Sequence, residues 1–156
     1  MKTLILYATK HGATREIAQC ISDHLGDTTL YDLKQGNAPA LIGFDCIIIG
    51  SSLYAGSIRK EAKVFVRQNA DQLQAKTLGL FLSGIVANEE QKSFEDNFPE
   101  KILQAAKAKA LLGGIFDPGK AGVIARYLVK IITKQSGYVD TISNDKIEQF
   151  VKQLKI

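Results

Sequence analysis

Short apolar runs alternate along the chain with segments whose apolar residues recur every three or four positions. The first run covers residues 2–8, and the strongest, over 44–50, contains three consecutive isoleucines. Between them, the segment 17–25 follows a helical spacing that Gly26 ends. Continuous apolar runs are typical of strands buried on both faces of a parallel sheet, and a period of three to four residues is typical of an amphipathic helix. The pattern therefore predicts strands and helices in alternation.

The same patterning extends to the rest of the chain. We expect strands over residues 2–8, 28–33, 44–50, 77–82 and 108–116. We expect helices ending at Leu25, over 59–69, within 91–106, over 121–134 and at the end of the chain. The strand over 28–33 is more polar than the others, which favours a place toward an edge of the sheet. Pro99 starts a fresh turn within 91–106, and the glycines at 113 and 114 weaken the fifth strand.

The last helix has a cap and a clear apolar face in the sequence. Asn144 or Asp145 is suited to cap it, because short polar side chains accept hydrogen bonds from first-turn N–H groups. The residues expected to face the core are Ile147, Phe150, Val151 and Leu154.

This order of elements predicts a three-layer α/β fold. Strands that alternate with helices form a parallel sheet covered on both faces, with right-handed crossovers. The 156 residues fit one domain of ordinary size, and the sequence contains no internal repeat. We therefore expect a single domain over residues 1–156.

Composition narrows the class of protein. Twenty Lys and Arg against sixteen Asp and Glu give a net charge of +4, which suits anionic surfaces, but no Arg-rich run or aromatic RNA-binding motif favours nucleic acid. The apolar runs are too short to span a membrane, and the amino end lacks a cleavage site, so we expect a cytoplasmic protein. Cys20 and Cys46 have no metal-binding spacing, so we expect free thiols and no metal.

Three of the expected strands end in loops of small and polar residues. These loops cover 9–14, 51–57 and 83–88. In an open parallel sheet, ligands bind beyond the carboxyl ends of the strands, where the strand order reverses. If the three strands are the first, third and fourth, their loops are neighbours and form one crevice.

The first loop has the features of an anion site. It opens a helix, so backbone N–H groups and the helix dipole converge on one anion, with Gly12 permitting close approach and Thr9 and Thr14 adding hydroxyl donors. The alternative is that a threonine only caps the helix. A triphosphate would need a lysine and a metal-binding hydroxyl at a spacing that is absent here, and the Walker-like segment 114–121 has Ala121 in the hydroxyl position. A terminal monophosphate fits better.

Thr9-Lys10-His11-Gly12-Ala13-Thr14 resembles the flavodoxin phosphate loop, Ser/Thr-x-Thr-Gly-x-Thr, with His11 in place of the central hydroxyl residue. The resemblance implies a flavodoxin-like sandwich, a five-stranded parallel sheet in order 2-1-3-4-5, and FMN bound without metal. The first loop would hold the phosphate, and the other two loops the ring and ribityl chain. The cofactor-binding residues implied in this way are Thr9, Lys10, His11, Gly12, Ala13, Thr14, Ser51, Ser52, Leu53, Tyr54, Ala55, Gly56, Ser83, Gly84, Ile85, Val86, Ala87 and Asn88.

Other segments resemble the menaquinone-dependent protoporphyrinogen oxidase branch of the flavodoxins. They include Gly50-Ser51-Ser52-Leu53, Ile85-Val86-Ala87, and Lys130 to Gly137 before Asp140-Thr141. This branch implies an FMN-dependent oxidoreductase of heme biosynthesis that oxidises protoporphyrinogen IX with a quinone acceptor. Tyr54-Ala55 stands where that branch would have Arg-Tyr. No acid or base pair is visible in the sequence, and no catalytic residue is assigned, which fits chemistry carried by the cofactor.

Several alternatives stay open at this stage. Tyr54 either stacks on the flavin or is an ordinary loop tyrosine; His11 either contacts the phosphate or is an exposed loop residue; Lys10 either attracts the anion or points to solvent. The helix over 121–134, with Arg126, Lys130 and Lys134 on one side, either touches the inner face of an anionic membrane or packs on the core. The protein itself is a quinone-linked oxidoreductase, an electron carrier with a redox partner protein, or a flavin-free module that binds phosphate ligands.

Overall fold

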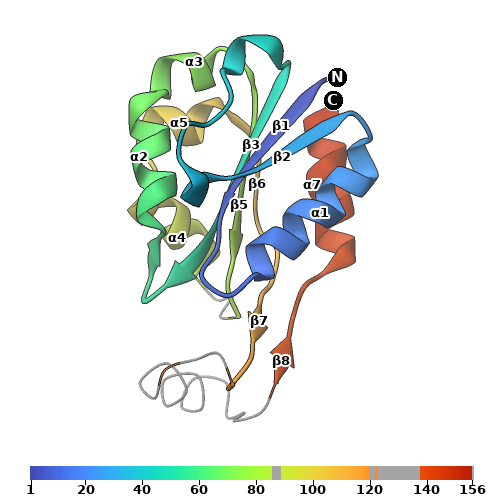
Figure 1. The fold of residues 1–156 in the computed structure, drawn as a ribbon, viewed down its shortest axis with the longest axis vertical. Helices are drawn as coiled ribbons and strands as arrows, with labels where there is room; N and C mark the ends of the chain where they lie inside the picture. Colours follow the sequence, from blue (N-terminus) through green and yellow to red (C-terminus); the bar gives the residue numbers. More distant parts are fainter. Residues whose placement is uncertain (86–88, 120–121, 123–137, 156) are drawn as a thin grey trace.

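The computed structural model describes residues 1–85, 89–119, 122 and 138–155, and it has a central sheet between two layers of helices (Figure 1). The parallel strands run in the order β2-β1-β3-β5-β6. Their bounds are β1 Thr3–Ala8, β2 Thr28–Asp32, β3 Cys46–Tyr54, β5 Thr77–Ser83 and β6 Ala106–Leu111. Counted among the parallel strands alone, this is the expected order 2-1-3-4-5. The flavodoxin-like α/β fold is therefore confirmed, with the polar strand β2 at an edge.

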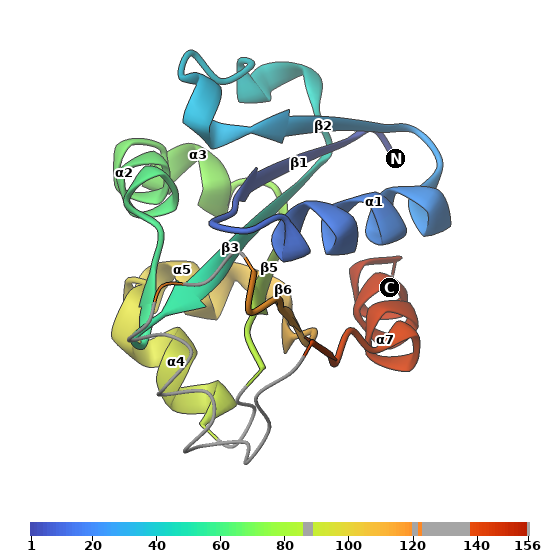
Figure 2. The same ribbon diagram turned by 60° about the horizontal axis from the view of Figure 1, so that its bottom comes forward.

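Helices cover both faces of this sheet (Figures 1 and 2). One face carries α1 (Ala13–Leu25) and α7 (Asn144–Lys155). The other face carries α2 (Lys60–Gln68), α3 (Ala70–Gln74), α4 (Glu90–Asn97) and α5 (Glu100–Ala105). Two 3₁₀ turns, η1 (Leu33–Gln35) and η2 (Leu41–Gly43), connect β2 to β3. The turn started by Pro99 separates α4 from α5, as expected.

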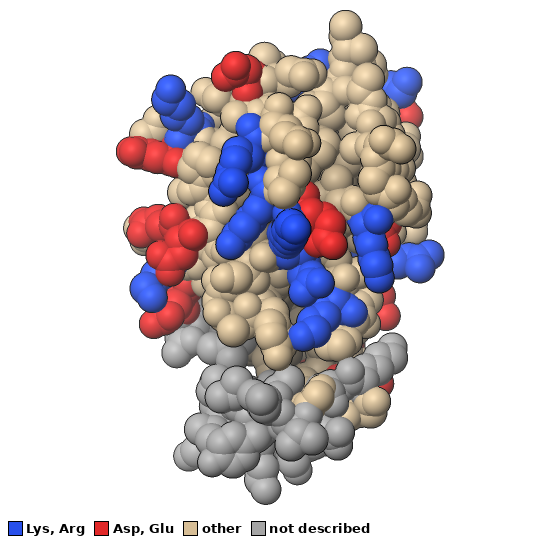
Figure 3. Space-filling view, turned by 60° about the vertical axis from the view of Figure 1, so that its left-hand side comes forward, with Lys and Arg blue, Asp and Glu red and all other residues tan. Residues whose placement is uncertain are grey.

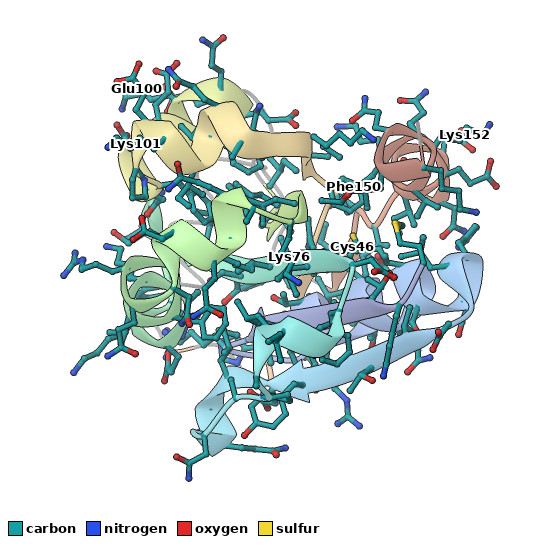
Figure 4. All side chains as sticks on the ribbon, turned by 90° about the horizontal axis from the view of Figure 1, so that it is seen from above. Cys46, Lys76, Glu100, Lys101, Phe150 and Lys152 are labelled. Carbon is teal, nitrogen blue, oxygen red and sulfur yellow. The ribbon has the colours of Figure 1, made fainter. Side chains whose placement is uncertain are left out.

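The hydrophobic core is divided by the sheet into two parts. Alternate residues of a strand point to opposite faces, so Leu4 and Leu6 pack toward α2 whereas Ile5 packs toward α1 and α7. Phe150 of α7 and Cys46 of β3 lie between that helix and the sheet, as the view from the amino ends of the strands shows (Figure 4). The four α7 residues expected to face the core are all buried. Strands buried on both sides explain why their sequences read as continuous apolar runs.

The third strand is longer than the sequence indicates. We expected it to end at Gly50, but β3 continues to Tyr54 and turns back into β4 (Ser57–Ile58), with which it pairs antiparallel. The segment expected as a loop is therefore mostly a hairpin. Its polar residues continue the strand because they pair with β1 and β5, a contact that local sequence does not reveal.

The fifth strand and the last helix also differ from expectation. β6 ends at Leu111, and the segment β7 (Ile115–Phe116) belongs to a separate pair with β8 (Val139–Asp140). Gly113, with φ of 93°, breaks the strand. Ser143, not Asn144 or Asp145, caps α7, because its Oγ accepts the N–H of Lys146 at 3.3 Å. The helix expected over 121–134 lies outside the described residues except for Gly122.

Candidate functional site

The carboxyl ends of three neighbouring strands meet at one edge of the sheet, at the bottom of Figure 1 and toward the viewer in Figure 2. In the strand register Ala8 of β1 lies opposite Ser51 of β3, and Ser52 lies opposite Ser83 of β5. The loops after β1 and β5 and the β3–β4 hairpin therefore lie next to one another. Residues far apart in sequence come together at this edge.

The loop after β1 is shaped by Gly12. This residue has φ of 100° and is the N-cap of α1, and its N–H donates to Oγ1 of Thr9 at 2.8 Å. A side chain is strained at this φ, although the space beside Gly12 is open. In an α-helix the first N–H groups have no acceptor within the helix, so those of Ala13, Thr14 and Arg15 point out of the end of α1 toward the loop. The loop thus presents backbone donors and the positive end of the helix dipole.

The two threonine hydroxyls of this loop have partners inside the protein. Oγ1 of Thr14 and Oγ of Ser83 lie 2.7 Å apart, and both side chains are buried. In this pair one hydroxyl donates to the other, so one proton is left to donate elsewhere; Thr9, which accepts from Gly12, also keeps its own proton. The sequence predicts both hydroxyls as donors to the anion. In the structure, Thr9 keeps one proton to donate and the Thr14–Ser83 pair keeps another. The hydrogen bond between Thr14 and Ser83 also connects the loop to β5.

The β3–β4 hairpin is fixed by polar contacts at its base and its tip. Oγ of Ser51 accepts the N–H of Arg59 at 2.9 Å and donates to the carbonyl of Ser52 at 3.0 Å. At the tip, Ala55 and Gly56 have φ of 49° and 78°, the positive values of a tight two-residue turn whose twist matches the strands. The hydroxyl of Ser51 thus has two partners within the protein, and its contact with a cofactor stays a prediction.

Asn97, at the end of α4, holds the hairpin by two side-chain hydrogen bonds. Its Oδ1 accepts the N–H of Ile58 at 2.9 Å, and its Nδ2 donates to the carbonyl of Gly56, also at 2.9 Å. Asn97 is not among the site residues expected from the sequence. Only the folded structure shows that Asn97 contacts the hairpin, because the bonded residues are 39 or more positions apart in the chain.

Tyr54 and Lys10 face each other across this edge. Tyr54, the last residue of β3, is 44% exposed. The ammonium of Lys10 lies 3.2 Å from the centroid of the Tyr54 ring, a cation–π contact. The sequence left open whether Lys10 attracts the anion or points to solvent, and in the structure its ammonium lies over this ring. His11, next to Lys10, is exposed.

The third loop starts at the buried Ser83 and continues beside the end of β6. The N–H of Gly84 donates to the carbonyl of Gly113 at 2.9 Å, and the side chain of Leu53 lies against Gly84. Ile85 is half-buried. Val86, Ala87 and Asn88, which the sequence analysis also included in the site, lie outside the described residues.

Among these loops lies a buried hydroxyl that has no partner in the described part of the chain. Oγ of Ser52 is buried, and no described residue hydrogen-bonds to it. Ser52 points to the same face of the sheet as Ser83, its neighbour in register, and this is the face that carries α1. Buried polar groups in native proteins are almost always hydrogen-bonded, so such a group marks a place where a further partner fits.

The charges around the first loop are mainly positive. Lys10 and Arg15 are exposed there, and Glu16 is the acidic residue in the first turn of α1. Farther along, Lys and Arg side chains gather on the face that carries α2, to which this helix contributes Lys60, Lys63 and Arg67 (Figure 3). The pKa of Tyr7 is raised, first by burial and then by Asp32, with Arg15 acting in the opposite direction. Tyr7 is therefore a neutral phenol at the end of β1.

An open groove of about 720 Å³ lies away from these loops, between α2 and residues 36–42. Its lining includes Leu33, Ile42, Val64 and Phe65 and none of the predicted site residues. No helix in the described part of the chain is long and apolar enough to cross a membrane. The strand-end loops are thus the part of the described chain where polar groups, positive charge and an unpartnered hydroxyl coincide.

Comparison with known protein families shows to which family this chain belongs. The model of the flavodoxin domain matches residues 4–142, which is most of the chain. The chain belongs to the flavodoxin family. Among its relatives is the protoporphyrinogen IX dehydrogenase (quinone) of Escherichia coli strain K12, 27% identical over 153 residues, which covers 88% of this chain and 81% of that protein.

Solved flavodoxins have the same fold as this chain. The flavodoxin of Streptococcus pneumoniae superimposes with a TM-score of 0.61 at 18% identity, covering 99% of this chain and 98% of that one. The flavodoxin of Fusobacterium nucleatum, solved bound to flavin mononucleotide, gives a TM-score of 0.53 at 17% identity, covering 99% and 98%. At these identities the likeness shows the shared fold, and it places the three loops of this chain at the carboxyl edge of a flavodoxin sheet.

Proposed function

We propose that this flavodoxin binds FMN at the three strand-end loops and transfers electrons through it. The observation that carries the proposal is the buried hydroxyl of Ser52, which has no hydrogen-bond partner among the described residues and lies where the hairpin meets the Thr14–Ser83 pair and the amino end of α1. A ligand with a polar edge and a terminal phosphate fits this set of donors. The family match and the FMN-bound flavodoxin of F. nucleatum support the same ligand.

The residues of the chain divide the work of binding. The N–H groups at the start of α1, with the protons left on Thr9 and on the Thr14–Ser83 pair, suit a phosphate, and Arg15 adds positive charge. Ser52, Leu53 and Tyr54 of the hairpin and Gly84 with Ile85 of the third loop suit the polar edge and the planar ring. When bound, FMN supplies the reversible uptake of one or two electrons, and the chain provides orientation and exclusion of water.

For the reaction, we propose oxidation of protoporphyrinogen IX with a quinone as the electron acceptor. The E. coli relative of that name supports this choice, since it covers 88% of the chain. The net charge of +4 supports it as well, because the substrate carries carboxylates and exposed lysines and arginines attract them. Cytoplasmic location with contact to the inner face of a membrane follows as part of the same proposal, since a lipid quinone resides there.

Two measurements test the proposed function in sequence. The purified protein, or the protein after addition of FMN, should show the absorption bands of a bound flavin; a colourless protein that also fails to bind added FMN contradicts the proposal. The FMN-loaded protein should then oxidise protoporphyrinogen IX under anaerobic conditions when menaquinone is added, with a variant unable to bind FMN as the control. Turnover no faster than in that control would contradict the proposed oxidation and favour an electron carrier as the function.

A further inference from the structure

The contact between Lys10 and Tyr54 has a consequence for flavin recognition. The Lys10 ammonium lies 3.2 Å from the centroid of the Tyr54 ring and covers one face of it. A planar ligand cannot stack on a ring face while a cation occupies it at this distance. Apart from this contact, the aromatic side chain of Tyr54 is open to solvent at the proposed flavin site, with 44% of its surface exposed.

Of the two residues, Lys10 is the one that can move. The backbone at Tyr54 is paired with Ser57 in the hairpin, and the hairpin is braced by Asn97. Lys10 is on the exposed loop after β1, and its long side chain rotates about four bonds. Its backbone lies only two residues before Gly12, the residue that caps α1 where the phosphate is proposed to bind. Lys10 therefore reaches both the ring and the phosphate region.

We propose that Lys10 is a specificity-determining residue that couples access to the Tyr54 ring to the phosphate of the flavin. Without ligand its ammonium covers one face of the ring. With FMN the phosphate, which carries close to two negative charges at pH 7, draws the ammonium away and frees the ring face for stacking. A flavin without phosphate must displace the ammonium with no such compensation. This inference rests on the proposed FMN-binding function.

The strengths of the two contacts support this exchange. A cation–π contact at an exposed site is weak, whereas a hydrogen-bonded ammonium and phosphate make one of the stronger polar contacts in proteins. Lys10 therefore binds the phosphate in preference to the ring when FMN is present, and stays over the ring when no phosphate is present. The chain would in this way discriminate FMN from riboflavin both by direct phosphate contacts and by a penalty imposed on riboflavin.

The test compares binding of FMN and riboflavin to wild type and to Lys10→Ala, followed by flavin fluorescence. Removing the ammonium should tighten riboflavin binding by about two- to fivefold, the equivalent of an exposed cation–π contact, and weaken FMN binding by roughly three- to tenfold. The two ligands thus respond in opposite directions. Riboflavin binding that is unchanged or weaker in Lys10→Ala overturns the proposal.

The chain offers a matched control. Lys2 lies over the ring of Phe44 at 5.4 Å from its centroid, at the amino end of β1 and far from the site. Lys2→Ala removes the same charge and the same kind of contact, and it should leave both affinities unchanged. In a Tyr54→Leu background, Lys10→Ala should no longer tighten riboflavin binding; a gain that persists there would mean that the ring is not involved.

A second readout follows Lys10 directly by NMR. Protons held over an aromatic face resonate upfield, so the Lys10 side-chain signals should be shifted in the ligand-free protein and normal in Tyr54→Leu. Saturating FMN should return them to normal positions in the wild type. If FMN binds and the shift persists, the role of Lys10 is wrong while the proposed function stands. If neither flavin binds, the proposed function and the role of Lys10 are both wrong.

Discussion

Oγ1 of Thr14 and Oγ of Ser83 form a buried hydrogen bond of 2.7 Å that joins the start of α1 to the end of β5. The two residues are 69 positions apart in the chain. Because this bond fixes the end of the helix against the sheet, it also fixes the loop whose backbone N–H groups are proposed to hold the phosphate. Stability and ligand binding therefore share this contact.

Replacing Thr14 by valine removes the hydroxyl and keeps the shape of the side chain. Ser83 then has a buried hydroxyl without this partner, so we expect a loss of about 1–3 kcal/mol in the free energy of unfolding, measured in urea. We also expect FMN to bind roughly tenfold more weakly, because the loop loses its anchor. In Thr14→Val/Ser83→Ala, where both partners are apolar, the stability should recover in part.

Thr28→Val is the matched control for this variant. Thr28 forms a hydroxyl pair with Ser22 near the other end of α1. Its loss should lower stability and leave FMN affinity unchanged. If Thr28→Val weakens FMN binding as much as Thr14→Val does, the effect comes from general destabilisation and not from the anchored loop.

Gly12 is required by the backbone of the first loop. At φ of 100° a β-branched side chain is strained, so Gly12→Val should cost about 1–2 kcal/mol or shift the loop, and FMN affinity should fall. Gly43 also has open space beside it but has no positive φ, so Gly43→Val is the control and should bind FMN as the wild type does. Calorimetric titration with FMN measures both. Unchanged affinity in Gly12→Val would show that this loop does not hold the phosphate.

The sequence predicted the parallel strands and the helix after the first loop from local patterns, whereas the order of the strands in the sheet was implied by the resemblance to the flavodoxins. Residues 46–49 form a continuous apolar run, and Gly12 follows the first strand at the start of a helical period. Burial of strands on both faces and the start of a helix leave traces in neighbouring residues, which is why these features were correctly predicted.

The details of the site depend on contacts between distant segments. Nothing near Ser51 in the sequence shows that its hydroxyl holds Arg59, or that the strand continues to Tyr54 by pairing with its neighbours. The covering of Tyr54 by Lys10 joins residues on two different strand ends. A loop prediction from small and polar residues found the right region, and it gave the wrong local structure for the hairpin.

Asn97 is expected to hold the hairpin that carries Tyr54. Asn97→Ala removes the partners of the Ile58 N–H and the Gly56 carbonyl, so hydrogen exchange at Ile58 should speed up by roughly tenfold, the effect of losing about 1.4 kcal/mol of local stability. FMN affinity should fall as the hairpin loosens. Asn69→Ala, which removes a bond from the side chain to the carbonyl of Phe65 in α2, is the control. Slow exchange at Ile58 in Asn97→Ala would show that the brace is dispensable.

Because of Cys46, we expect the free energy of unfolding to decrease as the pH rises through the alkaline range. Burial raises the pKa of this thiol from 9.0 to about 11, with the bond to Thr3 acting in the opposite direction. The folded chain therefore holds the proton more tightly than the unfolded chain. The resulting stabilisation is complete below about pH 9 and is lost as the pH rises toward 11, by up to about 1.4 kcal/mol per pH unit.

Cys46→Ala isolates this effect, because alanine does not titrate. The free energy of unfolding of the wild type should fall more steeply than that of Cys46→Ala between pH 9 and 11, and the two should run parallel below pH 8. The pKa of Cys20 is also raised by burial, but this thiol is only half-buried, so Cys20→Ala should change the slope less. A thiol reagent at pH 8 should likewise modify Cys20 before Cys46, since Cys46 is inaccessible and protonated. Parallel curves through pH 11, or early modification of Cys46, would mean that β3 opens to solvent without global unfolding.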